Sequence, residues 1–243
     1  MPPPTEFTSE VNEFELGALQ AAIAARNHRR RRRMKPRNPS IPLAAKIAFT
    51  VWMLYWIPVT IWGYGPQNFL WLCNVAKFLL LYGIWTENRL ILSSQAGVMT
   101  LVGLGWTVDF LAGLPFGESL AGFTSYMFNP ERPLLARITS LYHIALLPWA
   151  LWLVWRAGYD RRGPWLQCGL GAAALISARL LTEPQHNVNW VYDVFGREFE
   201  WLPPAFIVPL LVVAYPAILY FPGHALVMWL LRRFPPPSAG KWI

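Results

Sequence analysis

Long apolar runs are the feature that most constrains how this chain can fold. In lipid, only helices and closed barrels satisfy every backbone hydrogen bond. The runs here are continuous and lack the alternation of barrel strands, so they favour helices. They cover residues 42–63, 66–85, 90–111, 133–155, 164–182 and 204–231. The sequence therefore predicts an all-α integral membrane protein with six transmembrane helices.

The composition agrees with a membrane location and bears on possible partners. Hydrophobic residues make up 55% of the 243-residue chain and charged residues only 14%, whereas soluble domains average about a quarter charged. The net charge of +8 is concentrated in a block at residues 26–37. Because this block precedes the first apolar run, it indicates an orientation signal and a site for anionic lipid headgroups, with no role in nucleic-acid binding. The predicted headgroup contacts are Arg29, Arg30, Arg31, Arg32 and Arg33.

The distribution of charge predicts the topology. Six crossings place both termini on one side, and the positive-inside rule makes that side cytoplasmic, in a bacterial inner membrane. The predicted inner side holds the 26–37 block, Arg89, Arg156, Arg161, Arg162, Arg232, Arg233 and Lys241. The predicted outer loops, 112–132 and 183–203, hold only Arg132 and Arg197 beside Glu118, Glu131, Glu183, Asp193, Glu198 and Glu200.

Three regions are expected along the chain. Residues 1–40 begin with acidic side chains and end with basic ones, and their apolar residues recur at helical spacing. This pattern is typical of an amphipathic helix at a membrane surface. Residues 41–234 form the predicted six-helix domain, and residues 235–243 form a short cytoplasmic tail.

Polar residues inside the predicted helices are the candidates for function, because such residues in a membrane usually face the bundle interior. Cys73 lies roughly 10 Å below the outer end of its helix, Lys77 is one turn deeper on the same face, and His143 lies roughly 15 Å down its own helix. The topology places these groups in the outer half of the bundle and predicts one polar pocket there, open towards the outer leaflet. The other candidates for this pocket are Asn74, Asp109, Arg179, Asn187 and Asn189.

A Cys–His pair at compatible depth indicates nucleophilic catalysis. A thiol must lose its proton to attack a carbonyl, an imidazole can take that proton, and a nearby ammonium favours the anion. Amides such as Asn74 and Asn187 or Asn189 can donate to an oxyanion. This chemistry needs no metal and no cofactor.

Structural roles are the alternative for the same residues. Lys77 or Arg179 can form an ion pair with Asp109, and the asparagines can shape a wet loop. The two cysteines, Cys73 and Cys168, lie in different apolar segments and need no redox partner.

Three short motifs resemble those of a known family. They are Leu-Cys-Asn at 72–74, the histidine of S-L-Y-H-I-A-L-L, and N-V-N-W at 187–190, in matching order. Across residues 60–232 the chain resembles six-helix membrane proteins that include the bacterial YwaF-like proteins and the animal transmembrane protein 164, an acyltransferase acting on phospholipids. More remotely it is similar to the androgen-induced hydrolases of fatty-acid esters, which have Thr in place of Cys.

The resemblance implies roles for individual residues. Cys73 matches the acyl-accepting cysteine, His143 the catalytic histidine, and Asn189 with Trp190 an Asn-aromatic pair. Lys77 and the basic extension are not part of the resemblance. Two hypotheses follow, namely a lipid acyltransferase or lipid-ester hydrolase, and a non-enzymatic accessory subunit that docks on a membrane-protein partner. A small transporter is a third, although no broken-helix pair or repeat favours it.

Overall fold

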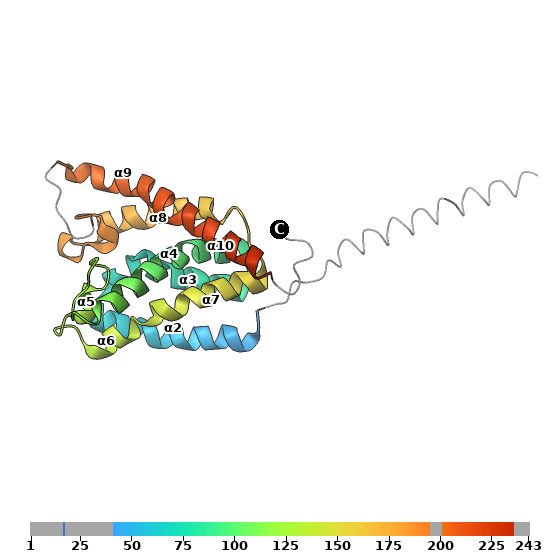
Figure 1. The fold of residues 1–243 in the computed structure, drawn as a ribbon, viewed down its shortest axis with the longest axis horizontal. Coiled ribbons are helices and arrows are strands. Elements are labelled where there is room, and N and C mark those ends of the chain that lie inside the picture. The colour runs from blue at the N-terminus through green and yellow to red at the C-terminus, as the bar shows by residue number, and fades with distance from the viewer. Residues whose placement is uncertain (1–16, 18–40, 195–200, 236–243) are drawn as a thin grey trace, which may run out of the picture. The chain divides into compact units, whose positions relative to one another are not determined.

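The computed structural model describes residue 17, residues 41–194 and residues 201–235. The chain divides into two units, residues 1–38 and residues 39–243. The predicted amphipathic segment 1–40 lies outside the described residues apart from Gly17, as does the predicted tail apart from Pro235. In the described part of the second unit every regular element is helical, which confirms the all-α fold class (Figure 1).

The elements follow one another along the chain as helices and short helical turns. They are α2 (Leu43–Tyr64), η1 (Pro66–Leu70), α3 (Leu72–Thr86), α4 (Arg89–Gly113), α5 (Ser125–Phe128), α6 (Leu134–Thr139), α7 (Tyr142–Ala157), α8 (Gly163–Leu181), η2 (Pro184–His186), η3 (Val188–Trp190), α9 (Pro204–Tyr215), the π-helical turn η4 (Pro216–Tyr220) and α10 (Phe221–Arg233). The long helices run side by side, and α2 begins at the end of the bundle where α10 finishes (Figure 1).

Four helical stretches in the described residues are long and apolar enough to cross a membrane. They are Leu43–Tyr64, Arg89–Gly113, Leu134–Ala157 and Pro204–Arg233, and α3 is a shorter apolar helix. These stretches support a membrane protein. The count of six crossings and the side on which the termini lie stay predictions.

Helix α4 is the central element of this bundle. It packs against α3, α7, α8 and α10, and 50% of its apolar stretch is buried, compared with 22% or 33% in the other three candidate spans. Residues 92–100 are all buried, so no side of this stretch faces lipid. Its polar side chains are satisfied by neighbours, since Gln95 Nε2 donates to Ser94 Oγ (2.9 Å) and Gln167 Oε1 (3.0 Å).

Small residues allow the helices to pack backbone to backbone, as is common in membranes. A Cβ added to Gly223 in α10 would lie 2.0 Å from the carbonyl oxygen of Gly97 in α4. A Cβ added to Gly63 in α2 would lie 2.4 Å from the Cβ of Ala136 in α6. Neither glycine can be replaced without moving a helix.

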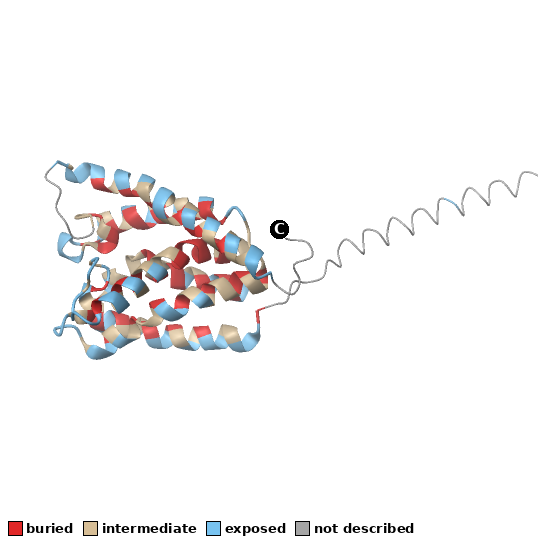
Figure 2. Cartoon of the chain, in the orientation of Figure 1, coloured by how far each residue is buried: buried red, intermediate tan, exposed pale blue. Residues whose placement is uncertain are grey.

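The outward faces of the bundle are apolar. Exposed residues line α2 and α9 (Figure 2), and they include Leu54, Trp62 and Val213, which are 67%, 64% and 71% exposed. A water-soluble protein rarely exposes such a surface. Lipid acyl chains are the solvent that suits it.

Candidate functional site

Cys73 lies in the first turn of α3, directly after the short turn η1. Its side chain is partly buried, and its Sγ lies 3.6 Å from the Tyr142 hydroxyl of α7 and 3.7 Å from Asn74 Oδ1. The first turn of a helix presents backbone N–H groups that have no partner within the helix, and its dipole favours an anion there. The thiol therefore sits in a setting common among reactive cysteines.

Asn74 is held in one orientation by two other elements. Its Nδ2 donates to the Asn68 carbonyl of η1 (2.5 Å), and its Oδ1 accepts from the Tyr142 hydroxyl (2.9 Å). The side-chain oxygen consequently faces the thiol as an acceptor. In this arrangement Asn74 positions Cys73 and Tyr142, and its amide nitrogen is directed at the backbone of η1.

Asn189 clamps the start of α3 from a distant part of the chain. Its Oδ1 accepts from the Leu72 backbone N–H (2.9 Å), and its Nδ2 donates to the Leu70 carbonyl (2.7 Å). Its own carbonyl accepts from the Tyr215 hydroxyl (3.0 Å). Because both atoms of the amide hold backbone on either side of Trp71, Asn189 fixes the turn that delivers Cys73.

The segment carrying this clamp is conformationally strained. Asn187, Asn189 and Trp190 all have positive φ, at 36°, 55° and 63°. Asparagine tolerates this region, but a bulky residue there costs roughly 1–3 kcal/mol and persists only where its surroundings dictate it. Trp190 packs edge-on against Trp71, with ring centroids 5.4 Å apart. The strained backbone therefore places Trp190 against Trp71 at the η1–α3 junction.

Asn187 shapes the same segment and lies away from the thiol. Its Oδ1 accepts from the backbone N–H groups of Tyr192 (3.0 Å) and Asp193 (3.1 Å), and its Nδ2 donates to the Asp193 carbonyl (2.8 Å). This is the loop-shaping role that the sequence left open as an alternative.

A break between α6 and α7 positions His143. At Ser140 and Leu141 the backbone bonds shift to residues three apart, and the Ser140 carbonyl becomes available to the histidine. His143 Nδ1 lies 2.9 Å from that carbonyl. Because a carbonyl only accepts, Nδ1 carries the hydrogen, and Nε2 of the neutral ring is an acceptor.

The His143 ring is buried between two other rings. It stacks on Trp106 of α4 and on Tyr142, with centroids 4.6 Å and 4.0 Å away. In the described part of the chain no hydrogen bond joins His143 to the Cys73 sulfur. Instead, Tyr142 links them, because its hydroxyl contacts the sulfur and its ring stacks on the imidazole.

Lys77 lies one turn beyond Cys73 and is fully buried, with 0% of its surface exposed. Its Nζ has no hydrogen-bond partner among the described residues. It lies between two aromatic faces, 3.3 Å from the Tyr142 ring centroid and 3.4 Å from that of Trp56 in α2. The predicted ion pair with Asp109, one of the alternatives, does not form in this part of the chain.

Asp109, near the end of α4, binds the loop at residues 119–124, and none of its hydrogen bonds involves a residue that contacts the thiol. Its carboxylate accepts hydrogen bonds from the Ser119 and Thr124 hydroxyls (2.6 and 2.7 Å) and from the N–H groups of Leu120, Ala121 and Thr124 (3.0, 2.7 and 2.9 Å). Arg179 does not pair with it either, since its guanidinium lies 4.3 Å from the centroid of the Tyr192 ring. Both residues stabilise loops in this structure.

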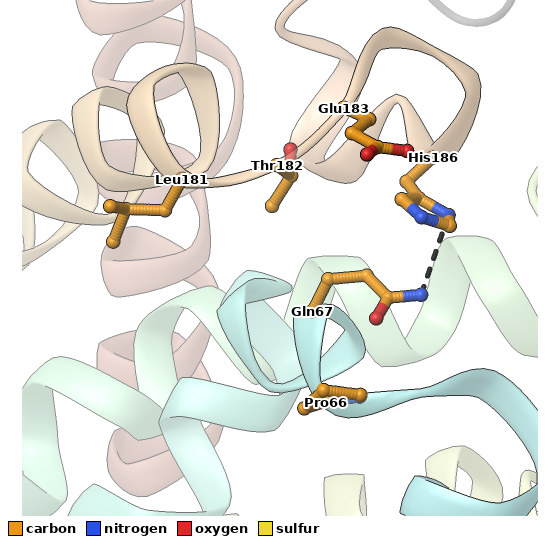
Figure 3. Close-up of a pocket in the computed structure, with 6 residues that line it drawn as sticks. All are labelled: Pro66, Gln67, Leu181, Thr182, Glu183 and His186. Carbon is orange, nitrogen blue, oxygen red and sulfur yellow. Dashed lines mark hydrogen bonds between the residues drawn. The ribbon is translucent and has the colours of Figure 1, made fainter.

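A depression of about 430 Å³ opens beside η1 (Figure 3). It is lined by Pro66, Gln67, Leu181, Thr182, Glu183 and His186, with Gln67 Nε2 3.4 Å from His186 Nδ1. Neither Cys73 nor His143 lines it. It adjoins Asn68, the residue whose carbonyl holds Asn74.

Tyr142 is the site residue that the sequence reasoning missed. It contacts Cys73, Asn74, Lys77 and His143, so it is the centre of the group. The available signal was its place next to His143 in S-L-Y-H.

The site contains a nucleophilic thiol and two basic groups, Lys77 and His143. Among the described residues no group of three or more His, Cys, Asp or Glu side chains is placed to hold a metal ion. Comparisons of the chain with protein-family models, with curated proteins and with solved structures found no match.

Proposed function

We propose that the protein is a membrane-embedded acyl-transfer enzyme, a lipid acyltransferase or lipid-ester hydrolase, with Cys73 as its nucleophile. The observation that carries the proposal is the placement of the thiol. Cys73 sits in the first turn of α3 against the Tyr142 hydroxyl, and that turn is held by Asn189 from 117 residues away in sequence. A thiol needs such positioning to attack a carbonyl, whereas a packing cysteine does not.

The reaction has two steps. The sulfur attacks the ester carbonyl of a lipid, and the alcohol leaves with the proton that the thiol gives up, which produces a thioester on Cys73. Water then yields hydrolysis, or a lysolipid hydroxyl yields transfer. His143 Nε2 takes the proton of this second nucleophile, and a proton returns to sulfur as the thioester breaks. The Leu72 and Asn74 N–H groups in the first turn of α3 are already bonded, to Asn189 Oδ1 and to the Trp71 carbonyl, so the Cys73 N–H is the nearest backbone oxyanion donor.

The six-crossing topology is part of the proposal. Helix α3 and η1 together span roughly 30 Å, at about 1.5 Å and 2.0 Å per residue, which matches the hydrocarbon thickness of a bilayer. The 19 residues of α8 give a similar length. Both termini are then cytoplasmic, in a bacterial inner membrane, and the depression beside η1 faces the outer leaflet, where a lipid headgroup can rest.

The arginine block outside the described residues completes the arrangement. We place Arg29, Arg30, Arg31, Arg32 and Arg33 against anionic headgroups of the cytoplasmic leaflet.

Active-site labelling tests the proposal. A lipid-like fluorophosphonate or a thiol-reactive acyl probe is expected to label the wild-type protein in membranes and to leave Cys73→Ala unlabelled. His143→Ala is expected to acquire the label at close to the wild-type rate but to release the acyl group of the acyl probe from Cys73 more slowly, because His143 acts on the second nucleophile. Cys168→Ala is the matched control and should label like the wild type. Equal labelling of wild type and Cys73→Ala would refute the acyl-transfer proposal.

One observation favours a second candidate, a non-enzymatic subunit of a larger membrane complex. The side chains of Asn74, Asn187, Asn189 and Asp109 all have structural hydrogen-bond partners. On this reading the cluster stabilises the bundle, and the exposed apolar faces contact a partner protein. Purification from native membranes separates the two, because a subunit would co-purify with a partner at fixed stoichiometry and carry no labelled cysteine.

A further inference from the structure

A buried lysine without a hydrogen bond needs an explanation. Transfer of an amine into an apolar interior is unfavourable unless the amine is paired, and buried charges are normally paired or coordinated. Lys77 has 0% exposure, and its Nζ makes no hydrogen bond among the described residues. A methionine would fill the same space without that penalty, so packing alone does not account for the amine.

The surroundings of Lys77 suit an amine that becomes charged. The Nζ atom lies between the faces of Tyr142 and Trp56, at 3.3 Å and 3.4 Å from their centroids, and 5.7 Å from that of Trp52. Aromatic faces attract a cation, most strongly where water is excluded. This cage offers little to the neutral amine and stabilises the ammonium form.

Lys77 and Cys73 lie one helical turn apart on α3. Residues four apart on a helix are neighbours on one face, so Lys77 lies beneath Cys73, and Tyr142 contacts both. Cys73 and Lys77 also interact electrostatically. His143, by contrast, makes no hydrogen bond to the sulfur in the described structure, and its Nδ1–H is engaged by the Ser140 carbonyl.

We propose that Lys77 is the proton acceptor for the Cys73 thiol. As the sulfur attacks an electrophilic carbon, the S–H bond breaks, the Lys77 nitrogen gains the proton, and the aromatic cage stabilises the ammonium that forms. The ammonium then returns the proton to the leaving alkoxide, so that the amine is neutral again after acylation. Buried lysines serve as general bases because burial favours the neutral amine, whose lone pair can take a proton. This role rests on the proposed function only for the identity of the electrophile.

Alkylation of the thiol tests the proton acceptor separately from acyl transfer. The full-length protein carries two cysteines, so the Cys168→Ala background leaves Cys73 as its single thiol. The rate constant for N-ethylmaleimide addition is measured at neutral pH by intact mass, in lipid nanodiscs. Lys77→Met and Lys77→Arg are both expected to lower it by about 100-fold, the scale of one general base.

The arginine variant separates a proton acceptor from a simple charge. Arginine keeps a cation in place but cannot take a proton at neutral pH. A wild-type rate in Lys77→Arg would overturn the proposal in favour of an electrostatic role, and a wild-type rate in Lys77→Met would overturn any role in activation. Tyr82→Phe, an exposed change on the same helix, is the control and should react like the parent.

Two further variants keep the test decisive if a Lys77 substitution distorts the bundle. Trp56→Leu removes one face of the cage and is expected to lower the rate about tenfold, while Trp56→Phe keeps a ring and is expected to lower it less. His143→Gln is expected to stay within about threefold of the parent, because its base acts on the second nucleophile. A large loss in His143→Gln with none in Trp56→Leu would assign the thiol proton to His143 and overturn the proposal.

The outcomes distinguish this inference from the proposed function. If acyl probes fail to label Cys73 but alkylation still depends on Lys77, the acyl-transfer proposal is wrong and the proton acceptor stands. If acyl probes label Cys73 and alkylation ignores Lys77, the reverse holds.

Discussion

Two buried charged side chains in this bundle are treated in opposite ways. Asp109, at the end of α4, accepts five hydrogen bonds from a single loop. Lys77, in the first half of α3, makes none among the described residues and lies between two aromatic rings. The Asp109 carboxylate therefore has structural hydrogen-bond partners. The Lys77 amine has none among the described residues, and it lies one helical turn from a thiol.

The contrast separates residues that hold the fold from residues available for chemistry. A polar group with every partner in place contributes stability, and removing it exposes the partners. A buried polar group without hydrogen-bond partners destabilises the fold and keeps a lone pair or a proton free for chemistry. Substitution of a hydrogen-bonded group should therefore lower mainly the free energy of unfolding, whereas substitution of the unpaired group should lower mainly the reactivity of the thiol.

The largest loss of stability is expected from Asp109→Ala. Four residues of the 119–124 loop lose their common acceptor, which should lower the free energy of unfolding by at least ~3 kcal/mol. Thermal unfolding in detergent, followed by tryptophan fluorescence, should show a midpoint lower by about 10 °C. If the midpoint moved no more than that of an exposed control such as Glu131→Ala, the filled-acceptor interpretation of Asp109 would be wrong.

Asn189→Ala should produce a smaller loss together with a change at the thiol. The amide holds Leu70 and Leu72 on both sides of Trp71, so its removal should destabilise by about 2–3 kcal/mol. It should also slow alkylation of Cys73, because the first turn of α3 is no longer fixed. Asn187→Ala is the matched control on the same loop, and it should destabilise without changing the alkylation rate. Unchanged alkylation in Asn189→Ala would contradict the clamp.

Lys77→Met should not destabilise the fold, in contrast to Asp109→Ala and Asn189→Ala. Replacing an unpaired buried amine by an apolar side chain of similar length is expected to leave the free energy of unfolding unchanged or to raise it by up to ~2 kcal/mol, so the unfolding midpoint should stay the same or rise. The loss appears only in thiol reactivity, the trade-off expected of a functional residue. A destabilisation as large as that of Asp109→Ala would show that the aromatic cage is structural.

The smallest effect is expected for the pair of partly buried Asp160 and exposed Arg162, in the turn before α8. The Arg162 guanidinium, 2.8 Å away and largely exposed, lowers the pKa of the Asp160 carboxyl through its hydrogen bonds. A depressed folded pKa gives stability above the unfolded value that is lost as pH falls through the folded one. Asp160→Asn should change stability at neutral pH by less than ~1 kcal/mol. Unfolding midpoints of parent and variant should converge further at acid pH, and divergence there would contradict the assignment.

The sequence predicted the helices well and their interruptions poorly. Each of the six apolar runs corresponds to helix within a few residues, because continuous hydrophobicity in lipid leaves the backbone no alternative. It did not predict the break at Ser140–Leu141 or the π-helical turn at Pro216–Tyr220. The close approach of Gly171 to Tyr220 depends on packing between helices that no local pattern encodes, whereas Pro216, at the start of the π-helical turn, is a local signal for an interrupted helix.

For the site, depth along the helices was predictable and partnership was not. Counting residues from the helix ends placed Cys73, Lys77 and His143 at compatible depths in the outer half of the bundle, and in the structure Tyr142 contacts all three and Asn74. The ion pairs considered for Asp109 do not form in the described residues, because the loop at residues 119–124 donates its hydrogen bonds to the carboxylate instead. The family resemblance and the acyl-transfer chemistry stay predictions.

The most direct measurement is the covalent state of Cys73 after exposure to an acyl donor. Protein in nanodiscs is incubated with a short-chain phospholipid ester, quenched in acid, digested and analysed by mass spectrometry. The acyl-transfer account predicts the donor's acyl mass on the Cys73 peptide, released by neutral hydroxylamine as a thioester must be, and absent from Cys73→Ala. An unmodified Cys73 peptide, or an equal adduct on Cys168, would contradict it.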